Sequence, residues 1–255
     1  MTPAKDLTNN AFASQGEALR MMILDRLMEI RDEGYKKFTA ALIPGIDLDK
    51  MLGVRVPAIR KLAASVLKED PHALQHYMEW FRQAGRDGCY YEEKLLWGIL
   101  LSKAAMTDEE RMMHYDAFVP FIDNWAVCDI ACAKLNAAKR NPDIWLEYFI
   151  GYVARGTEFE IRFGVVMLLA NFIDDEHIDR VLSALSKVDH PAYYVTMGVG
   201  WTLAACYVRF PQKTEALLAT GILSRDVQNK TIQKIRESNS VSKADKETMK
   251  GYKII

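Results

Sequence analysis

The stretch DNWAVCDIACAKLN, residues 123–136, holds a helix start and two chemically useful side chains. Asp123 or Asn124 can accept a free backbone N–H and so begin a helix. Trp125 and Asp129 then lie four residues apart, which is one helical turn, so they share a face. An indole face beside a carboxylate can hold a cationic, planar ligand. The same spacing also occurs as a packed ring beside a solvated acid, and the rest of the chain must decide between these interpretations.

Composition is typical of a globular protein. The chain has 255 residues, of which 50% are hydrophobic and 26% charged. No apolar run approaches the roughly 18 residues that span a membrane, so we expect no membrane association. The first residues, MTPAKDLTNNAFASQG, lack an apolar core. We therefore expect a loosely ordered tail over residues 1–15, no signal peptide and a cytoplasmic protein.

Cysteine spacing and net charge restrict the possible functions. The four cysteines, Cys89, Cys128, Cys132 and Cys206, do not form two ligand pairs with zinc spacing. We expect reduced, buried thiols and no metal site. The net charge of −1 lacks the basic excess that is usual in nucleic-acid-binding proteins. Binding to nucleic acid would have to come from a local arrangement of charge.

Apolar periodicity predicts helices along nearly the whole chain, without strand alternation or hairpin signals. Thr107 with Glu110, and Thr157 with Glu160, have the spacing of capping boxes. The sequence therefore predicts an all-α fold. The expected helices cover residues 16–33, 34–41, 56–68, 72–84, 90–103, 108–118, 125–138, 143–154, 158–172, 176–187, 191–210, 212–220, 225–237 and 243–252.

An internal repeat organises these helices. Steps of 34 residues lead through Arg60, Lys94, Cys128, Arg162, Thr196 and Lys230, and four of these six are basic. The residues four positions further on are nearly all small: Ala64, Gly98, Cys132, Val166, Gly200 and Lys234. This period fits stacked two-helix units, an α-solenoid whose inner helices line a concave surface. A row of Arg and Lys there would follow a phosphate backbone. An ordinary bundle with helices of similar length could give the same period by chance.

Several stretches together resemble DNA alkylation repair glycosylases of the AlkD type, which are built from HEAT-like helical repeats. They keep their order and spacing from about residue 20 to 240. The resemblance implies a single HEAT-like domain over residues 16–255, wound into a superhelix with a basic concave face. The matching stretches are GVRVPAIRKLA from Gly53, YYEEKLLWGILL from Tyr90, DNWAVCDIACAK from Asp123, EIRFGVVMLLANFI from Glu160, YYVTMGVGWTLAACYVRFP from Tyr193 and VQNKTIQKIRES from Val227.

The resemblance also implies an activity, namely excision of N3- or N7-alkylated purines from duplex DNA by hydrolysis of the N-glycosidic bond. The catalytic acid of the family corresponds to Asp129, the cleft tryptophans to Trp125 and Trp201, and the cleft arginine to Arg162. A cationic alkylpurine leaves as a neutral base, so the reaction needs no general acid, cofactor or metal. A fixed carboxylate can stabilise the oxocarbenium-like sugar and position the attacking water.

We expect a monomer that acts on duplex DNA carrying alkylated bases, with Arg60, Lys94, Lys230 and Lys234 on the DNA backbone. Residues 225–255 hold eight Lys or Arg against four Asp or Glu, a local basic excess. The low net charge of the whole chain leaves an alternative. The protein could be a non-catalytic HEAT-like module that binds nucleic acid or protein.

The remaining conspicuous side chains have simpler interpretations. Trp80, Trp97 and Trp145 are assigned to the core. Tyr91, Glu92 and Glu93 are candidates for the rim of the cleft.

Overall fold

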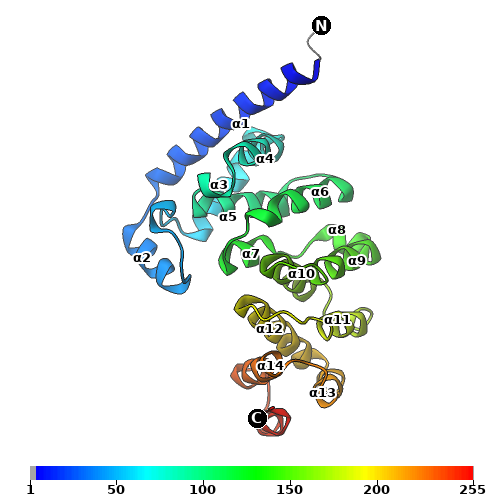
Figure 1. Cartoon of the computed structure of the whole chain (residues 1–255). Helices are drawn as coiled ribbons and strands as arrows, with labels where there is room; N and C mark the ends of the chain where they lie inside the picture. The colour runs from blue at the N-terminus through cyan, green and yellow to red at the C-terminus, as the bar shows by residue number, and fades with distance from the viewer. Residues whose placement is uncertain (1–3, 255) are drawn as a thin grey trace. The chain divides into compact units, whose positions relative to one another are not determined.

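The structure is a computed structural model that describes the backbone of residues 4–254 and the side chains of residues 15–254 (Figure 1). Over this range it contains fifteen α-helices, four short 3₁₀ helices and no strand. The all-α class predicted from the sequence is therefore confirmed. Residues 1–3 of the expected tail lie outside the described residues.

Contacts between Cα atoms divide the chain into two compact units, Met1–Ala131 and Cys132–Ile255. The single domain expected over residues 16–255 stays a prediction. The first helix, α1, begins at Ala4, inside the stretch expected to be a loose tail. Residues 4–15 contain neither glycine nor proline, so nothing in them interrupts a helix.

In the first unit, alternate helices pack on one another. Helix α3 packs on α5 and α5 on α7, while α1 packs on α4 and α4 on α6. Except for the pair α1 and α4, each of these contacts joins alternate helices. The elements are α1 Ala4–Glu29, α2 Glu33–Leu42, η1 Leu48–Lys50, α3 Val56–Glu69, α4 Ala73–Ala84, η2 Arg86–Gly88, α5 Tyr91–Lys103, α6 Asp108–Phe118, η3 Val119–Phe121 and α7 Trp125–Ala131.

The second unit has the same alternation. Helix α10 packs on α12 and α12 on α14, while α9 packs on α11 and α11 on α13. The elements are α8 Asn136–Arg140, α9 Pro142–Val153, α10 Glu158–Asn171, α11 Ile178–Leu185, α12 Tyr193–Arg209, α13 Pro211–Ala219, α14 Arg225–Glu237, α15 Lys243–Thr248 and η4 Met249–Tyr252.

The helix predicted over residues 125–138 is wrong in its second half. Helix α7 ends at Ala131, and α8 begins only at Asn136. The side chain of Asn171 satisfies the backbone between them. Its Oδ1 accepts from the N–H of Leu135 at 2.8 Å, and its Nδ2 donates to the carbonyl of Ala133 at 3.3 Å. These bonds stabilise an extended connection in place of further helical turns.

The predicted row of small residues marks close approaches between stacked helices. A Cβ on Gly98 of α5 would lie 2.7 Å from the Cβ of Ala131 on α7. A Cβ on Gly200 of α12 would lie 2.7 Å from the Cγ of Lys230 on α14. Both distances are far below van der Waals contact, so glycine permits the packing in each unit.

Local signals and core assignments agree with the structure. Thr107 and Glu110 form a capping box, and the Glu160 carboxylate accepts from the backbone N–H and the hydroxyl of Thr157. Trp97 and Trp145 are buried, and Trp80 is half-buried. All four cysteines are free; Cys89, Cys128 and Cys206 are buried, whereas Cys132 is half-buried.

No helix among the described residues combines the length and apolar character needed to cross a membrane. No group of three or more His, Cys, Asp or Glu side chains there could hold a metal ion.

Candidate functional site

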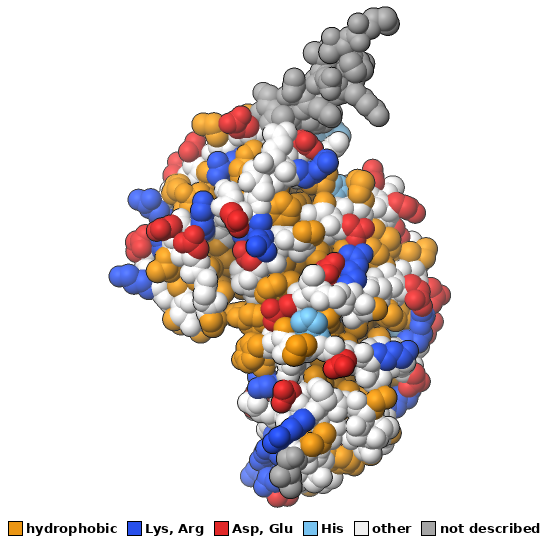
Figure 2. Space-filling model, in the orientation of Figure 1, with side chains coloured by type: hydrophobic (Ala, Val, Ile, Leu, Met, Phe, Trp, Pro, Cys, Tyr) orange, Lys and Arg blue, Asp and Glu red, His pale blue; other side chains and the backbone are white. Residues whose placement is uncertain are grey.

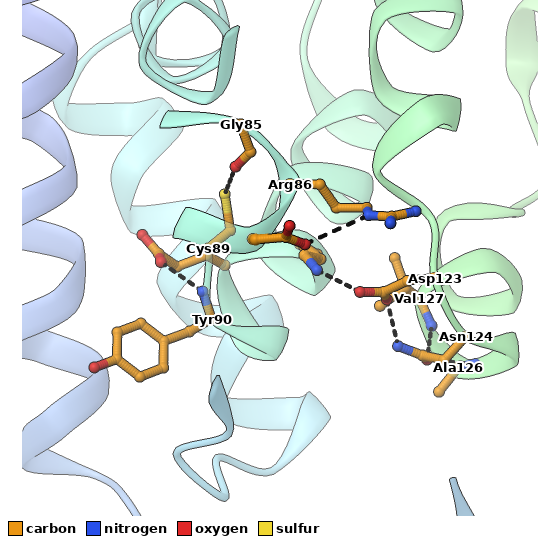
Figure 3. Close-up of polar contacts among 11 residues, drawn as sticks. Gly85, Arg86, Cys89, Tyr90, Asp123, Asn124, Ala126 and Val127 are labelled. Atoms are coloured by element: carbon orange, nitrogen blue, oxygen red, sulfur yellow. Dashed lines mark hydrogen bonds and ion pairs between the residues drawn. The ribbon is translucent and has the colours of Figure 1, made fainter. Parts of the chain in front are cut away.

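Helix α7 begins at an asparagine cap. The Oδ1 of Asn124 accepts from the backbone N–H groups of Ala126 and Val127, both at 3.0 Å (Figure 3). The sequence left either Asp123 or Asn124 as the possible N-cap, and the structure shows that it is Asn124. Its Nδ2 donates to Oδ1 of Asp123 at 2.8 Å, so Asp123 holds the capping side chain instead of capping the helix itself.

Trp125 and Asp129 lie one turn apart on α7, as the spacing predicted, and both are half-buried. The indole Nε1 of Trp125 donates to the carbonyl of Leu42, at the end of α2, at 3.0 Å. This bond fixes the plane of the ring while part of the side chain stays accessible. The candidate acid and the candidate cleft tryptophan of this unit thus come from one short, capped helix.

Lys94 does not present its charge to solvent. Its side chain is 7% exposed, and its Nζ donates to Oδ2 of Asp123 at 2.5 Å. Arg60, on α3, is exposed and makes no ion pair within the described residues. Of the two cations that the sequence assigned to DNA in this unit, only Arg60 is displayed for a phosphate.

Glu92 is buried, so the cleft-rim interpretation does not fit it. Its carboxylate accepts from the N–H groups of Leu52, Gly53 and Val54, at 2.9, 2.7 and 3.2 Å. Burial raises the pKa of Glu92, and the three N–H donors counteract that shift. Gly53 has φ of 86°, and a Cβ there would meet the carbonyl of Asp32 at 2.4 Å. Glu92 therefore fixes the segment that leads into α3.

Glu93 is also buried and structural. Its Oε1 accepts from Nε of Arg20 at 3.0 Å, and its Oε2 accepts from the N–H of Tyr90 at 2.9 Å. The sequence could not locate either acid, since their partners are distant or depend on the exact helix start.

In the second unit, Arg162 and Trp201 line one groove. The groove has a volume of about 660 Å³ and is also lined by Met197, Val208 and Lys234. Trp201 is 42% exposed, so its ring is open to a ligand. The groove brings together, from separate helices, two of the three residues that the resemblance assigned to the cleft.

Arg162 is the buried member of that groove's lining, 5% exposed. Its Nη1 donates to the carbonyl of Tyr194 at 2.8 Å. A Cβ on Gly198 would lie 3.4 Å from the same nitrogen, so the guanidinium packs against the backbone of α12 at this glycine. The arginine is held in one orientation by α12.

Lys230 and Lys234 lie on α14 with their amines near solvent. Lys234 Nζ pairs with Oε2 of Glu237 at 2.8 Å, and this hydrogen bond lowers the pKa of Glu237. Lys230 Nζ donates to Oε1 of Gln233 at 2.9 Å. Lys230 also lines a pocket of about 720 Å³ together with Arg236, Lys253, Tyr193 and Asn229.

The surface view agrees with this distribution of charge. Figure 2 shows basic side chains gathered near the C-terminal end of the chain and mixed signs over the N-terminal unit. The C-terminal end is therefore locally basic, although the net charge of the whole chain is −1.

The fold and these residues define an all-helical protein with an acid and a tryptophan on one helix and displayed cations on others. The chain belongs to the family of DNA alkylation repair enzymes, whose family model matches residues 23–240 and so includes every candidate residue. Membership implies a role in alkylation repair, with DNA as the partner. Neither a search of curated proteins nor a search of solved structures gave a match.

Proposed function

We propose that this protein is a DNA glycosylase that hydrolyses the N-glycosidic bond of cationic N3- or N7-alkylated purines in duplex DNA. One observation carries the proposal: Trp125 and Asp129 lie one turn apart on α7, partly accessible, in a chain of the alkylation repair family. We further propose that no cofactor takes part.

The chemistry needs a fixed negative charge more than a proton donor. The alkylated purine leaves as a neutral base, and positive charge develops on the sugar. The Asp129 carboxylate stabilises that charge and orients a water molecule for attack. The Trp125 indole, anchored by its bond to Leu42, offers its face to the cationic base.

The second unit supplies contacts to DNA. Trp201 is exposed enough to stack, and Arg162 is oriented by its bond to Tyr194. Lys230 and Lys234 bind phosphates, as does the exposed Arg60 of the first unit, and their contribution falls as salt rises.

The alternate-helix packing within each unit supports an α-solenoid of HEAT-like repeats with a basic concave face. We also propose that the protein is a monomer and that it acts in the cytoplasm.

The second candidate is a non-catalytic HEAT-like module that binds nucleic acid or protein. The net charge of −1 and the burial of Lys94 favour it, because both reduce the basic surface. A module of this kind binds DNA or a protein without releasing any base.

One assay separates the two candidates. Duplex DNA containing N7-methylguanine is incubated with excess protein, and free base is measured by chromatography. Base release faster than the spontaneous rate supports the glycosylase. Saturable binding of the same duplex with no release above the spontaneous rate supports the module.

A further inference from the structure

Helix α7 is too short to fix its own position. It has seven residues, fewer than an isolated helix needs for stability. Its first turn depends on the Asn124 side chain, which accepts from two backbone N–H groups. The orientation of α7 therefore follows from whatever holds that side chain.

A continuous chain of polar contacts leads from α5 to the first turn of α7. Figure 3 shows its last links, from Asp123 through Asn124 to Ala126 and Val127. Lys94 Nζ donates to one oxygen of Asp123, and Asn124 Nδ2 donates to the other at 2.8 Å. Asn124 Oδ1 then accepts from Ala126 and Val127. The Asp123 carboxylate thus has the ammonium on one oxygen and the cap on the other.

Forming this ion pair costs desolvation free energy, which offsets much of what the pair could add to the stability of the fold. The Lys94 side chain is 7% exposed, so the ammonium has lost most of its hydration, whereas the Asp123 side chain is 34% exposed and its carboxylate keeps part of its own. An ion pair that desolvates one partner loses part of its Coulombic gain to that desolvation, and it often contributes little to net stability. The ion pair does fix the orientation of both side chains, since the ammonium and the carboxylate bind each other only in a narrow range of geometries.

We propose that Lys94 and Asp123 are positioning residues for the reaction at α7. The pair orients the amide of Asn124, the amide orients α7, and α7 places Trp125 and Asp129. This inference rests on the proposed function, and it gives Lys94 a role other than the phosphate contact expected from its place in the basic row.

Two features make the inference measurable. The Trp125 indole N–H, bonded to Leu42, reports the position of α7 in the free protein. A cavity of about 310 Å³ is lined by Lys94, Asp123 and Asn124. A small amine can therefore reach the ion pair when the lysine side chain is removed.

The first experiment uses the DNA-free protein and is independent of activity. Indole N–H resonances are recorded by NMR for wild type, Lys94→Met and Lys103→Met, and the Trp125 signal is assigned with Trp125→Phe. Lys103 is exposed at the end of the same helix and serves as the matched control. We expect Lys94→Met to move the Trp125 signal and Lys103→Met to leave it in place. An unmoved signal in Lys94→Met overturns the inference.

The second experiment measures single-turnover base release and DNA affinity. Lys94→Ala should lower the rate at least tenfold while leaving the Kd for DNA and its salt dependence unchanged. Propylammonium, which replaces the missing atoms, should restore the rate of Lys94→Ala but not that of Asp129→Asn. A phosphate contact instead predicts a slope of log affinity against log salt that is about one unit smaller. That outcome, or a wild-type rate in Lys94→Ala, overturns the inference.

A double variant keeps the test decisive if Lys94→Ala does not fold. Lys94→Met with Asp123→Asn removes both charges at similar volume. It should fold with a reduced rate and a shifted Trp125 signal, and a wild-type rate and spectrum would overturn the inference. If wild type releases no base, the proposed function fails, while the NMR comparison still decides whether the pair positions α7.

Discussion

Gly98 of α5 lies so close to Ala131, the last residue of α7, that a Cβ on it would come within 2.7 Å of the alanine Cβ. Carbon atoms in favourable contact are about 3.5–4.0 Å apart. The glycine therefore sets the spacing between the helix that bears Lys94 and the helix that bears Trp125 and Asp129.

Gly98→Ala should destabilise the protein by about 1–3 kcal/mol, because the extra methyl group forces α5 and α7 apart. Gly151→Ala on α9 is the matched control, since a Cβ there has no neighbour within 4 Å. That control should be neutral or more stable by up to about 1 kcal/mol, because alanine favours a helix interior. Urea unfolding of both variants measures the difference, and equal effects would contradict the packing argument.

Glu92→Gln should destabilise the first unit by about 1–3 kcal/mol, because the new amide group faces one of three backbone N–H donors. The exposed Glu109 provides a control, Glu109→Gln, which should have little effect. Denaturant unfolding at neutral pH measures both.

Glu92 also predicts a dependence on pH. Burial raises its pKa in the folded state above that of the unfolded chain, so the folded state binds this proton more readily. The resulting stabilisation is complete below the ordinary glutamate pKa and is lost as pH rises through the raised value. The difference in free energy of unfolding between wild type and Glu92→Gln should therefore fall as pH rises through the raised pKa. A difference that stays flat with pH would contradict it.

Lys230→Met and Lys234→Met should each reduce the slope of log DNA affinity against log salt by about 0.9, as expected for one lost phosphate contact. Glu237→Gln should strengthen binding, because it releases Lys234 from its ion pair. Lys187→Met, on an exposed lysine just after α11, is the control. Titrations at several salt concentrations give the slopes, and three equal slopes for the lysine variants would exclude α14 as a DNA contact.

Trp201→Ala should weaken binding or processing of alkylated DNA by about 1–3 kcal/mol, the usual value of one base–aromatic stack. The ring is 42% exposed, so thermal stability should change little. Trp145→Ala, at a fully buried tryptophan, should instead cost about 3–5 kcal/mol of stability. Affinity and melting temperature measured on the same preparations separate the two, and a large loss of stability in Trp201→Ala would show a core role.

Local patterns in the sequence predicted a good part of this fold. The shared face of Trp125 and Asp129 and the two capping boxes follow from spacings of three or four residues, so neighbouring residues suffice. The small residues at Gly98 and Gly200 also anticipated the close packing of stacked helices.

Other features depend on distant partners and were beyond sequence reasoning. The break after Ala131 depends on Asn171, which satisfies backbone groups far from it in the chain. Lys94 and Arg60 occupy equivalent repeat positions, yet only Lys94 meets an acid, Asp123, across the helix stack. A repeat places side chains on the same line of successive helices, but tertiary contacts decide which of them face solvent.

The most direct measurement of the central claim is the single-turnover release of N7-methylguanine from duplex DNA by wild type, Asp129→Asn and the exposed control Asp189→Asn. The amide keeps the size of the side chain but removes the charge that the developing oxocarbenium needs. We predict a loss of about a hundredfold or more in Asp129→Asn, equivalent to roughly 3 kcal/mol of transition-state stabilisation, with DNA affinity and melting temperature unchanged. A lower melting temperature with wild-type activity per folded molecule would contradict the account and assign Asp129 to packing.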